Sequence, residues 1–320
     1  MSWQKIVVLG TGGTIAGTSA QAGDNIGYKA AQVGVADLIA ATPALNGTGA
    51  VSMESEQVAQ IDSKDMDFEV WVRLAQRCQH HLADPLVRGL VITHGTDTLE
   101  ETAWFLHEVL DASKPVVLVS AMRPASALTP DGPQNLLDAV AVALDADASG
   151  VLAVAAGELH GPQLVHKVHP YRVHAFASGE SGPLGWVEEG AVRWGSNVSM
   201  VPEHRARVAI DTVAKAPAFP RVEVVMSHAG AGASLVDALV RDGVEGLVVA
   251  GTGNGSIHYA LEGALLRAQS SGVAVVRSSR CPQGQVLPKA GDVFVASRGL
   301  SPVKARISLM LDLIAAAAAR

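Results

Sequence analysis

Short apolar runs of strand length alternate with helical patterns along most of this chain, and this alternation constrains its fold more than any other feature. The apolar runs predict strands at 5–10, 89–93, 115–120, 151–156, 222–227, 246–251 and 273–277. The helical patterns lie at 34–42, 65–82, 99–110, 134–145, 233–241, 256–270 and 302–319. Strands and helices that alternate in this way form βαβ units with a parallel sheet. Because only 4% of the residues are aromatic, the core has to be aliphatic, which suits strands covered by helices on both faces.

The alternation stops between Glu188 and Pro220, where several X-Pro pairs stiffen the chain and no clear helical period is present. We therefore expect two α/β domains joined by a linker. The larger N-terminal domain, 1–200, would hold a mostly parallel sheet flanked by helices. The linker would be 201–220, and a smaller C-terminal α/β domain would span 221–320.

Charge and hydropathy argue against two classes of partner. The net charge of −7 disfavours nucleic acid, because phosphates need a basic face. The apolar stretch 307–319 contains Asp312 and is too short to cross a bilayer, so we expect a terminal amphipathic helix and no membrane partner. A strand that starts near Lys5 leaves no room for a signal peptide, which predicts a cytoplasmic protein unless the chain is a processed form. Cys78 and Cys281 are expected to be buried or half-buried free thiols.

Two glycine-threonine clusters follow predicted strands. The cluster Thr11-Gly-Gly-Thr14-Ile-Ala-Gly17 follows the first strand, and Thr93-His-Gly-Thr96-Asp-Thr98 follows the strand at 89–93. Ligands of parallel sheets bind at the carboxyl ends of the strands, so hydroxyls placed there are candidates for chemistry. A dinucleotide-binding loop is only weakly indicated, because Ile15 stands where its third glycine belongs.

Thr14 has two interpretations. The glycines before it can turn backbone N–H groups inward as an anion-stabilising nest, and its hydroxyl becomes a nucleophile once a base takes its proton. Alternatively, Thr11 and Thr14 only satisfy the backbone of a turn, as threonines often do. The residues of this cluster alone leave both interpretations open.

The second cluster carries an acid beside a hydroxyl. Asp97, next to Thr96, could orient that hydroxyl, bind a substrate ammonium or cap the following helix. Thr98 with Glu101 fits a capping box for the same helix, which leaves Asp97 available. Lys167 follows the strand at 151–156 and could carry a proton if it lay against Thr96 and Asp97; an isolated lysine is otherwise a solvated surface residue.

Histidines at positions 160, 166, 169 and 174 raise the question of a metal site. His166 and His169 have a usable spacing, but no third ligand is evident and no cysteine lies nearby, so we predict no metal. The chain also lacks a Gly-x-Ser-x-Gly elbow between a strand and a helix, which disfavours a serine hydrolase.

Taken together, the Thr11–Gly17 and Thr93–Thr98 motifs resemble the bacterial-type L-asparaginase family, the asparaginase/glutaminase amidohydrolases. The order and context of the motifs agree from the first strand to Lys304-Ala305-Arg306. The resemblance implies hydrolysis of L-asparagine to L-aspartate and ammonia through an acyl-enzyme, with a glutaminase side activity left open. It implies no metal and no organic cofactor.

The resemblance also implies roles for single residues. Thr14 corresponds to the primary nucleophile, and Tyr28 lies on a mobile loop that closes over the substrate and helps to activate it. Thr96, Asp97 and Lys167 correspond to the second catalytic group, in which an acid and a lysine support a hydroxyl.

Other positions match substrate-binding residues of the family. Ser63 corresponds to the serine that holds the substrate α-carboxylate, and Asp97 would hold the α-ammonium beside Thr96. Asn254 matches a residue that reaches the site of a neighbouring subunit. Members of the family assemble as dimers of dimers, so a homotetramer is expected.

The chain departs from the family at several positions. Lys64 follows Ser63 where members often carry Gln or Glu, and its charge should repel the substrate ammonium unless the side chain turns to solvent. The segment 280–289 has no carboxylate before Asp292, so the acidic residue that a partner subunit contributes in the family is not placed. Ala112 occupies the position of the second cysteine of secreted members, which agrees with a reducing compartment.

Alternative functions remain at this stage. One is a glutamine-preferring amidase or an amidotransferase subunit, although the latter would need a further domain. Another is a catalytically silent amino-acid-binding protein with the same fold. The joint presence of Thr14, Tyr28, Thr96, Asp97 and Lys167 disfavours the silent protein, because a binder needs no second supported hydroxyl.

Overall fold

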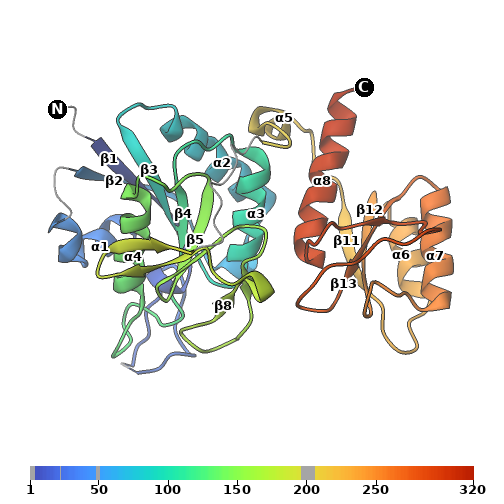
Figure 1. The fold of residues 1–320 in the computed structure, drawn as a ribbon, viewed down its shortest axis with the longest axis horizontal. Helices are drawn as coiled ribbons and strands as arrows, with labels where there is room; N and C mark the ends of the chain where they lie inside the picture. The colour runs from blue at the N-terminus through green and yellow to red at the C-terminus, as the bar shows by residue number, and fades with distance from the viewer. Residues whose placement is uncertain (1–3, 22, 48–50, 196–205) are drawn as a thin grey trace. The chain divides into compact units, whose positions relative to one another are not determined.

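The computed structural model describes residues 4–21, 23–47, 51–195 and 206–320, which form two compact α/β units (Figure 1). The first unit is Met1–Ile210 and the second is Asp211–Arg320. Within the predicted linker, 201–205 lie outside the described residues, and helix α5 (Ile210–Ala214) occupies part of the rest.

The first unit is built on an eight-stranded sheet with the order β10-β9-β6-β5-β4-β3-β1-β2. Its parallel part comprises β1 (Gln4–Gly12), β2 (Val51–Ile61), β3 (Val87–Thr93), β4 (Val116–Val119) and β5 (Val151–Ala155). Its antiparallel part comprises β6 (Glu158–His160), β9 (Gly185–Glu188) and β10 (Ala191–Trp194). The mostly parallel sheet predicted from the alternation is therefore confirmed.

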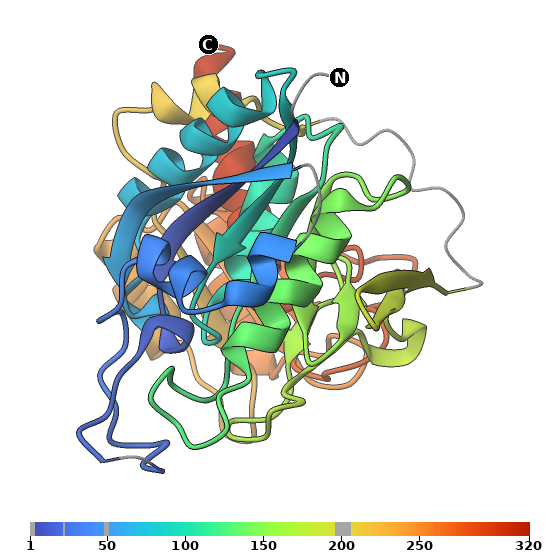
Figure 2. The same ribbon diagram turned by 90° about the vertical axis from the view of Figure 1, so that its left-hand side faces the viewer.

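Helices cover both faces of this sheet. Helices α1 (Val35–Ala40) and α4 (Gly132–Leu144) lie on one face, which is turned toward the viewer in Figure 2. Helices α2 (Phe68–Leu82) and α3 (Leu99–Val109) lie on the other. Every strand and helix predicted in this unit is present, with ends shifted by a few residues.

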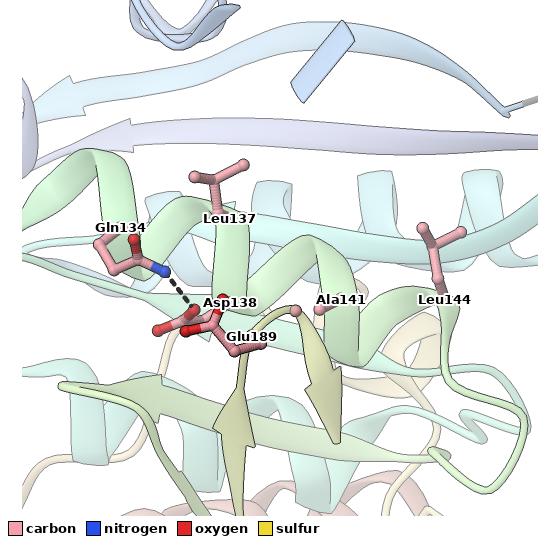
Figure 3. Close-up of a pocket in the computed structure, with 7 residues that line it drawn as sticks. Gln134, Leu137, Asp138, Ala141, Leu144 and Glu189 are labelled. Atoms are coloured by element: carbon pink, nitrogen blue, oxygen red, sulfur yellow. Dashed lines mark hydrogen bonds between the residues drawn. The ribbon is translucent and has the colours of Figure 1, made fainter. Parts of the chain in front are cut away.

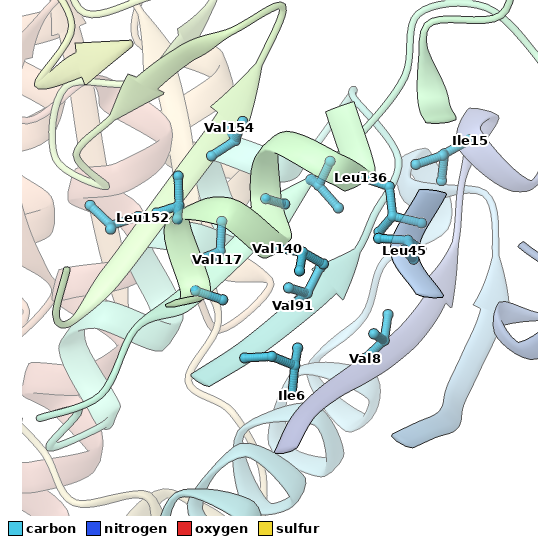
Figure 4. Close-up of a cluster of buried hydrophobic side chains, with 14 of the residues drawn as sticks. Ile6, Val8, Ile15, Leu45, Val91, Val117, Leu136, Val140, Leu152 and Val154 are labelled. Carbon is cyan, nitrogen blue, oxygen red and sulfur yellow. The ribbon is translucent and has the colours of Figure 1, made fainter. Parts of the chain in front are cut away.

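The core under α4 is aliphatic, as the low aromatic content requires. Val8, Val91 and Val117 point from adjacent parallel strands toward Leu136 and Val140 of α4 (Figure 4). All of these side chains are at most 2% exposed. Burying one such side chain contributes roughly 1.5–3 kcal/mol, so this layer fixes the sheet beneath the candidate site.

Strand β2 was missed by the sequence analysis although it runs for 11 residues. It is the edge strand beyond β1, and most of its residues are exposed or half-buried, so it carries no continuous apolar run. The β9–β10 hairpin was missed as well. Its turn residues Glu189 and Gly190 have φ angles of 50° and 76°, the left-handed backbone that a tight two-residue hairpin requires.

The second unit has a four-stranded parallel sheet with the order β11-β12-β13-β14. Its strands are β11 (Val222–Met226), β12 (Gly246–Gly251), β13 (Ala274–Ser279) and β14 (Val295–Ala296). Helices α6 (Ser234–Arg241) and α7 (Tyr259–Ser270) lie on one face, and α8 (Pro302–Ala318) lies on the other. No helix in the described part of the chain is long and apolar enough to cross a membrane.

Candidate active site

The two glycine-threonine clusters meet at one edge of the first sheet. Strands β1 and β3 are parallel neighbours, with Gly10 opposite Thr93, so their carboxyl ends lie side by side. Gly13, at φ 83°, and Gly95 bring the two loops into backbone contact, because a Cβ at Gly13 would overlap the Cα and N atoms of Gly95. Only glycine permits this approach. Thr11 stabilises the same junction, since its buried hydroxyl donates to the Thr93 carbonyl at 2.9 Å.

Thr14 lies just beyond the end of β1 and is 6% exposed. Its Oγ1 lies 2.6 Å from the Tyr28 hydroxyl oxygen, a distance at which either group can donate to the other. Tyr28 reaches this position because the chain folds back between Thr18 and Lys29, whose backbone groups form an antiparallel bridge. Gly17 gives the tyrosine ring room to lie against the backbone. Thr14 thus has a neighbouring hydroxyl that can take or relay its proton.

Lys167 lies on β7 (His166–Lys167) and reaches the second cluster from more than sixty residues away. Its Nζ donates to Thr96 Oγ1 at 2.8 Å and to Asp97 Oδ1 at 2.5 Å. The lysine side chain is 17% exposed, whereas that of Asp97 is 53% exposed. The interpretation of Lys167 as a solvated surface residue is therefore wrong. The three residues form a compact group in which a proton can pass between the hydroxyl and the amine.

Ser63 joins this group from a third segment, the short 3₁₀ helix η3 (Ser63–Asp65). Its Oγ accepts a hydrogen bond from the Asp97 backbone N–H at 3.2 Å, and its carbonyl accepts one from Thr98 Oγ1 at 2.7 Å. The predicted capping box at Thr98 is consequently wrong. Thr98 does precede α3 as its N-cap residue, but its hydroxyl binds the Ser63 segment instead of the helix.

Lys64, which was expected to disturb ammonium binding, points into solvent. Its side chain is 60% exposed and its amine forms an ion pair with Asp65. The neighbouring carboxylate raises the pKa of the lysine further, so the charge is present but compensated. The Lys64 side chain is thus turned to solvent, which is the one arrangement in which its charge was not expected to repel the substrate ammonium.

Comparisons with known proteins agree with this geometry. A family model described as Asparaginase, N-terminal, matches residues 5–200, and one described as Glutaminase/Asparaginase C-terminal domain matches residues 221–317. The chain belongs to the asparaginase family. The resemblance stated from the two motifs is confirmed, and members of this family are amidohydrolases that act on asparagine.

Individual relatives match the chain over nearly its full length. L-asparaginase 2 of Escherichia coli is 39% identical, with 96% of this chain and 88% of the relative covered. The glutaminase-asparaginase of Pseudomonas fluorescens is 37% identical, with coverages of 96% and 86%. The crystal structure of a probable cytoplasmic L-asparaginase from Campylobacter jejuni has a TM-score of 0.91 and 38% identity, with 97% of this chain and 95% of that chain covered.

Asn254 belongs to the second unit and lies in the turn after β12. It exchanges two hydrogen bonds with the backbone of Leu287, one from its Nδ2 at 3.0 Å and one to its Oδ1 at 2.7 Å. Asp292 accepts from Arg277 Nη2 at 2.5 Å and from the Lys289 backbone N–H at 2.8 Å. The first carboxylate after the 280–289 segment is thus engaged within its own unit.

The four histidines do not converge on one point, although His160 and His174 both lie near the Glu158 carboxylate, at 3.7 Å and 3.0 Å. His160 is buried and bonds Ser178, His166 bonds Glu100, and His174 bonds Glu158. Among the described residues, no group of three His, Cys, Asp or Glu side chains is arranged to hold a metal ion. Both cysteines are free; Cys78 is buried, and burial raises the pKa of its thiol. The exposed position of Cys281 differs from the prediction.

A chain of buried polar side chains that was not predicted supports the second cluster from below. His94 is fully buried, and its Nδ1 donates to the Gly95 carbonyl at 2.7 Å. Trp71 Nε1 donates to Thr102 Oγ1 at 2.8 Å, and that hydroxyl lies 2.9 Å from His94 Nε2. Burial lowers the pKa of His94 from 6.5 to about 4, so the ring is neutral at pH 7. The place of His94 inside the second motif was a signal in the sequence, but its side-chain partner Thr102 comes from α3 and is itself held by Trp71 of α2.

A cavity of about 530 Å³ lies elsewhere in the first unit, along α4 and the β9–β10 turn (Figure 3). Asp138 lines it and accepts a hydrogen bond from Gln134 Nε2 at 2.8 Å. Burial raises the pKa of the Asp138 carboxyl. None of the predicted site residues lines this cavity.

Proposed function

We propose that this chain is an L-asparaginase in which Thr14 is the nucleophile and the Thr96–Asp97–Lys167 group handles protons. The observation that carries the proposal is the meeting of two hydroxyls at one sheet edge, each with its own proton-handling partner. A carboxamide needs both, because its carbon must be attacked and its nitrogen must leave with a proton.

In the proposed reaction the Thr14 oxygen attacks the side-chain carboxamide carbon while its proton moves to the Tyr28 hydroxyl, which passes its own proton on toward the carboxamide nitrogen. The C–N bond then breaks, the nitrogen leaves as ammonia with this relayed proton, and the acyl group stays on the Thr14 oxygen as an ester. Water hydrolyses the resulting ester with proton transfer through Thr96 and Lys167, which releases aspartate and restores the Thr14 hydroxyl. Asp97 would bind the α-ammonium of the substrate, since its carboxylate is half exposed and lies beside Thr96 and Lys167.

Ser63 would bind the α-carboxylate through its hydroxyl, which lies beside Asp97. Such a grip on the amino-acid end orients the carboxamide relative to the nucleophile, and orientation supplies much of an enzyme's rate. The assignment of Asn254 to the site of a neighbouring subunit, in a homotetramer built as a dimer of dimers, is part of the same proposal. Light scattering on the purified protein tests it, with a mass four times that of one chain as the expected result.

Glutamine is a second candidate substrate, favoured by relatives named glutaminase-asparaginase. Ammonia release from asparagine and glutamine, measured side by side over a range of concentrations, separates the two. A higher kcat/KM for glutamine would replace the proposal by a glutamine-preferring amidase. Absence of turnover with both would favour a silent binding protein.

The nucleophile is tested by Thr14→Ala, which should lower kcat at least about 10³-fold and leave the assembly intact. Thr11→Ser is the matched control, because it changes the neighbouring threonine but keeps the hydroxyl that donates to the Thr93 carbonyl, and it should leave kcat near the wild-type value. Hydrolysis by the Thr14→Ala enzyme at a near wild-type rate would disprove the assignment.

We also propose residence in the cytoplasm, the compartment that appears in the name of the Campylobacter jejuni L-asparaginase. The free, buried thiol of Cys78 is consistent with a reducing compartment. Relatives differ in this respect, since the Haemophilus influenzae protein is named as periplasmic. Fractionation of the source cells decides between the compartments.

A further inference from the structure

Lys167 lies on β7, a very short strand that forms few backbone hydrogen bonds. Strand β7 has only two residues and pairs antiparallel with β8 (Phe176–Ala177), where His166 faces Ala177 and Lys167 faces Phe176. A ladder this short is marginal by itself. The pairing continues beyond the strand, where the Val168 backbone N–H donates to the Ala175 carbonyl at 2.7 Å, and Val165 just before it is fully buried. These contacts hold the backbone, but the Lys167 amine also has to stay at hydrogen-bond distance from Thr96, which depends on how β7 is oriented toward α3.

His166 supplies a contact with α3. Its Nδ1 lies 2.9 Å from Glu100 Oε2, and the two side chains are only 25% and 17% exposed. A carboxylate is an acceptor, so the ring N–H donates, and this bond forms with either a neutral or a charged imidazole. Glu100 belongs to the first turn of α3, the helix that begins directly after the second cluster.

His166 and Lys167, the two residues of β7, therefore both form side-chain bonds with the segment in which α3 begins. Lys167 bonds Asp97 and His166 bonds Glu100, two carboxylates that are three residues apart in the chain. The two side-chain bonds add to the backbone pairing with β8, and together they set the orientation of β7 relative to the start of α3. His174 lies on the same segment but bonds Glu158 of β6, so it does not share this function.

We propose that His166 is a positioning residue, whose bond to Glu100 keeps the Lys167 amine on the Thr96 hydroxyl. This inference rests on the proposed function, in which Lys167 moves a proton of Thr96. Its expected signature is a loss of kcat without a loss of substrate binding. Asp97 keeps its place independently, because its backbone N–H is bound by Ser63 Oγ.

The experiment is a steady-state comparison of His166→Leu and His166→Asn with asparagine. His166→Leu removes the donor and should lower kcat roughly 10- to 100-fold, as expected for a misplaced proton-transfer group, with KM changed less than about twofold. His166→Asn places an amide N–H near the position of Nδ1 and should restore most of the rate. His174→Leu is the matched control, since it removes another imidazole–glutamate pair, with a 61% exposed imidazole, and should leave kcat unchanged.

A double-mutant cycle covers the case in which His166→Leu folds poorly. Glu100→Leu should lower kcat like His166→Leu, and the double variant should be no slower than either single variant. A His166→Leu enzyme with wild-type kcat, with only a raised KM, or with only a lowered melting temperature would overturn the inference. So would His166→Asn being as slow as His166→Leu.

Lys167→Met separates this failure from failure of the proposed function. If Lys167→Met hydrolysed asparagine at the wild-type rate, the role of the lysine itself would be wrong, and the inference about His166 would fall with it. If Lys167→Met were slow and His166→Leu were not, only the inference would be refuted.

Discussion

Mild acid should destabilise the first unit of this protein because two of its histidines are buried as neutral rings. Burial lowers the pKa of His94 from 6.5 to about 4. The pKa of His160 is lowered to about 4 as well, chiefly by burial and then by the nearby His174. In the unfolded chain both rings regain the ordinary value. The unfolded state therefore binds more protons between pH 6.5 and 4, and stability falls as the pH falls through this range.

The size of the effect follows from the two pKa values. Each pKa unit corresponds to about 1.4 kcal/mol, so at pH 5 each histidine should remove about 2 kcal/mol relative to pH 7.5. Together they should remove about 4 kcal/mol, a large part of the roughly 5–15 kcal/mol that stabilises a typical domain.

Urea unfolding at pH 7.5 and pH 5, followed by tryptophan fluorescence, measures this loss. All five tryptophans precede residue 195, so the signal reports on the first unit alone. In His160→Asn the amide can keep a bond to Ser178 but cannot titrate, so the loss between the two pH values should shrink by about 2 kcal/mol. His80→Gln is the control, because it removes a histidine that is exposed on α2 instead of a buried one. If His160→Asn and the wild type lost equal stability at pH 5, the assignment of a depressed pKa to His160 would be refuted.

Three further predictions concern the site. Lys167→Met should lower the rate of ammonia release from asparagine by at least about 10²-fold, and a negligible effect would remove the lysine from the mechanism. Gly13→Ala should cost about 3 kcal/mol in urea unfolding, because it adds a clash with Gly95 to the strain of a positive φ. Gly150→Ala, at φ 69° with nothing within 4 Å, should cost only about 1 kcal/mol, and equal losses for the two variants would contradict the clash. Lys64→Gln should change KM for asparagine less than about fivefold, since the amine is exposed; a larger change would show that its charge reaches the substrate.

The parallel strands in the core of both units could be predicted, because a strand that is buried on both faces appears in the sequence as a continuous apolar run. The central strands β3, β4 and β12 each contain an uninterrupted run of buried aliphatic residues, Leu90–Ile92, Val116–Val119 and Leu247–Ala250. The edge strand β2 has the same backbone structure, but most of its side chains are at least partly accessible to solvent. It therefore has no apolar run to detect, and neither does the short β9–β10 hairpin.

The wrong prediction of a capping box at Thr98 shows that local spacing does not identify the partner of a side chain. Local spacing identified the start of α3 correctly, but the hydroxyl has a better partner in the Ser63 carbonyl, 35 residues away. Asp131 behaves in the same way at the start of α4, where its carboxylate accepts from the backbone N–H groups of Met122 and Arg123 at 2.9 Å. At the starts of α3 and α4, side-chain contacts with distant loops therefore replace helix capping, whereas Asp67 does cap α2 through the Val70 backbone N–H.

The sequence by itself determined which groups this protein has for chemistry: glycine-flanked hydroxyls after two buried strands, in the order typical of one family of amidohydrolases. It determined them because strand ends, glycine turns and motif order are local properties of the chain. Only the tertiary structure decided that β1 and β3 are neighbours, that Lys167 bonds Thr96 across 71 residues, and that Lys64 points away. Sheet order and side-chain direction depend on contacts between segments that are distant in the chain, and no local pattern encodes them.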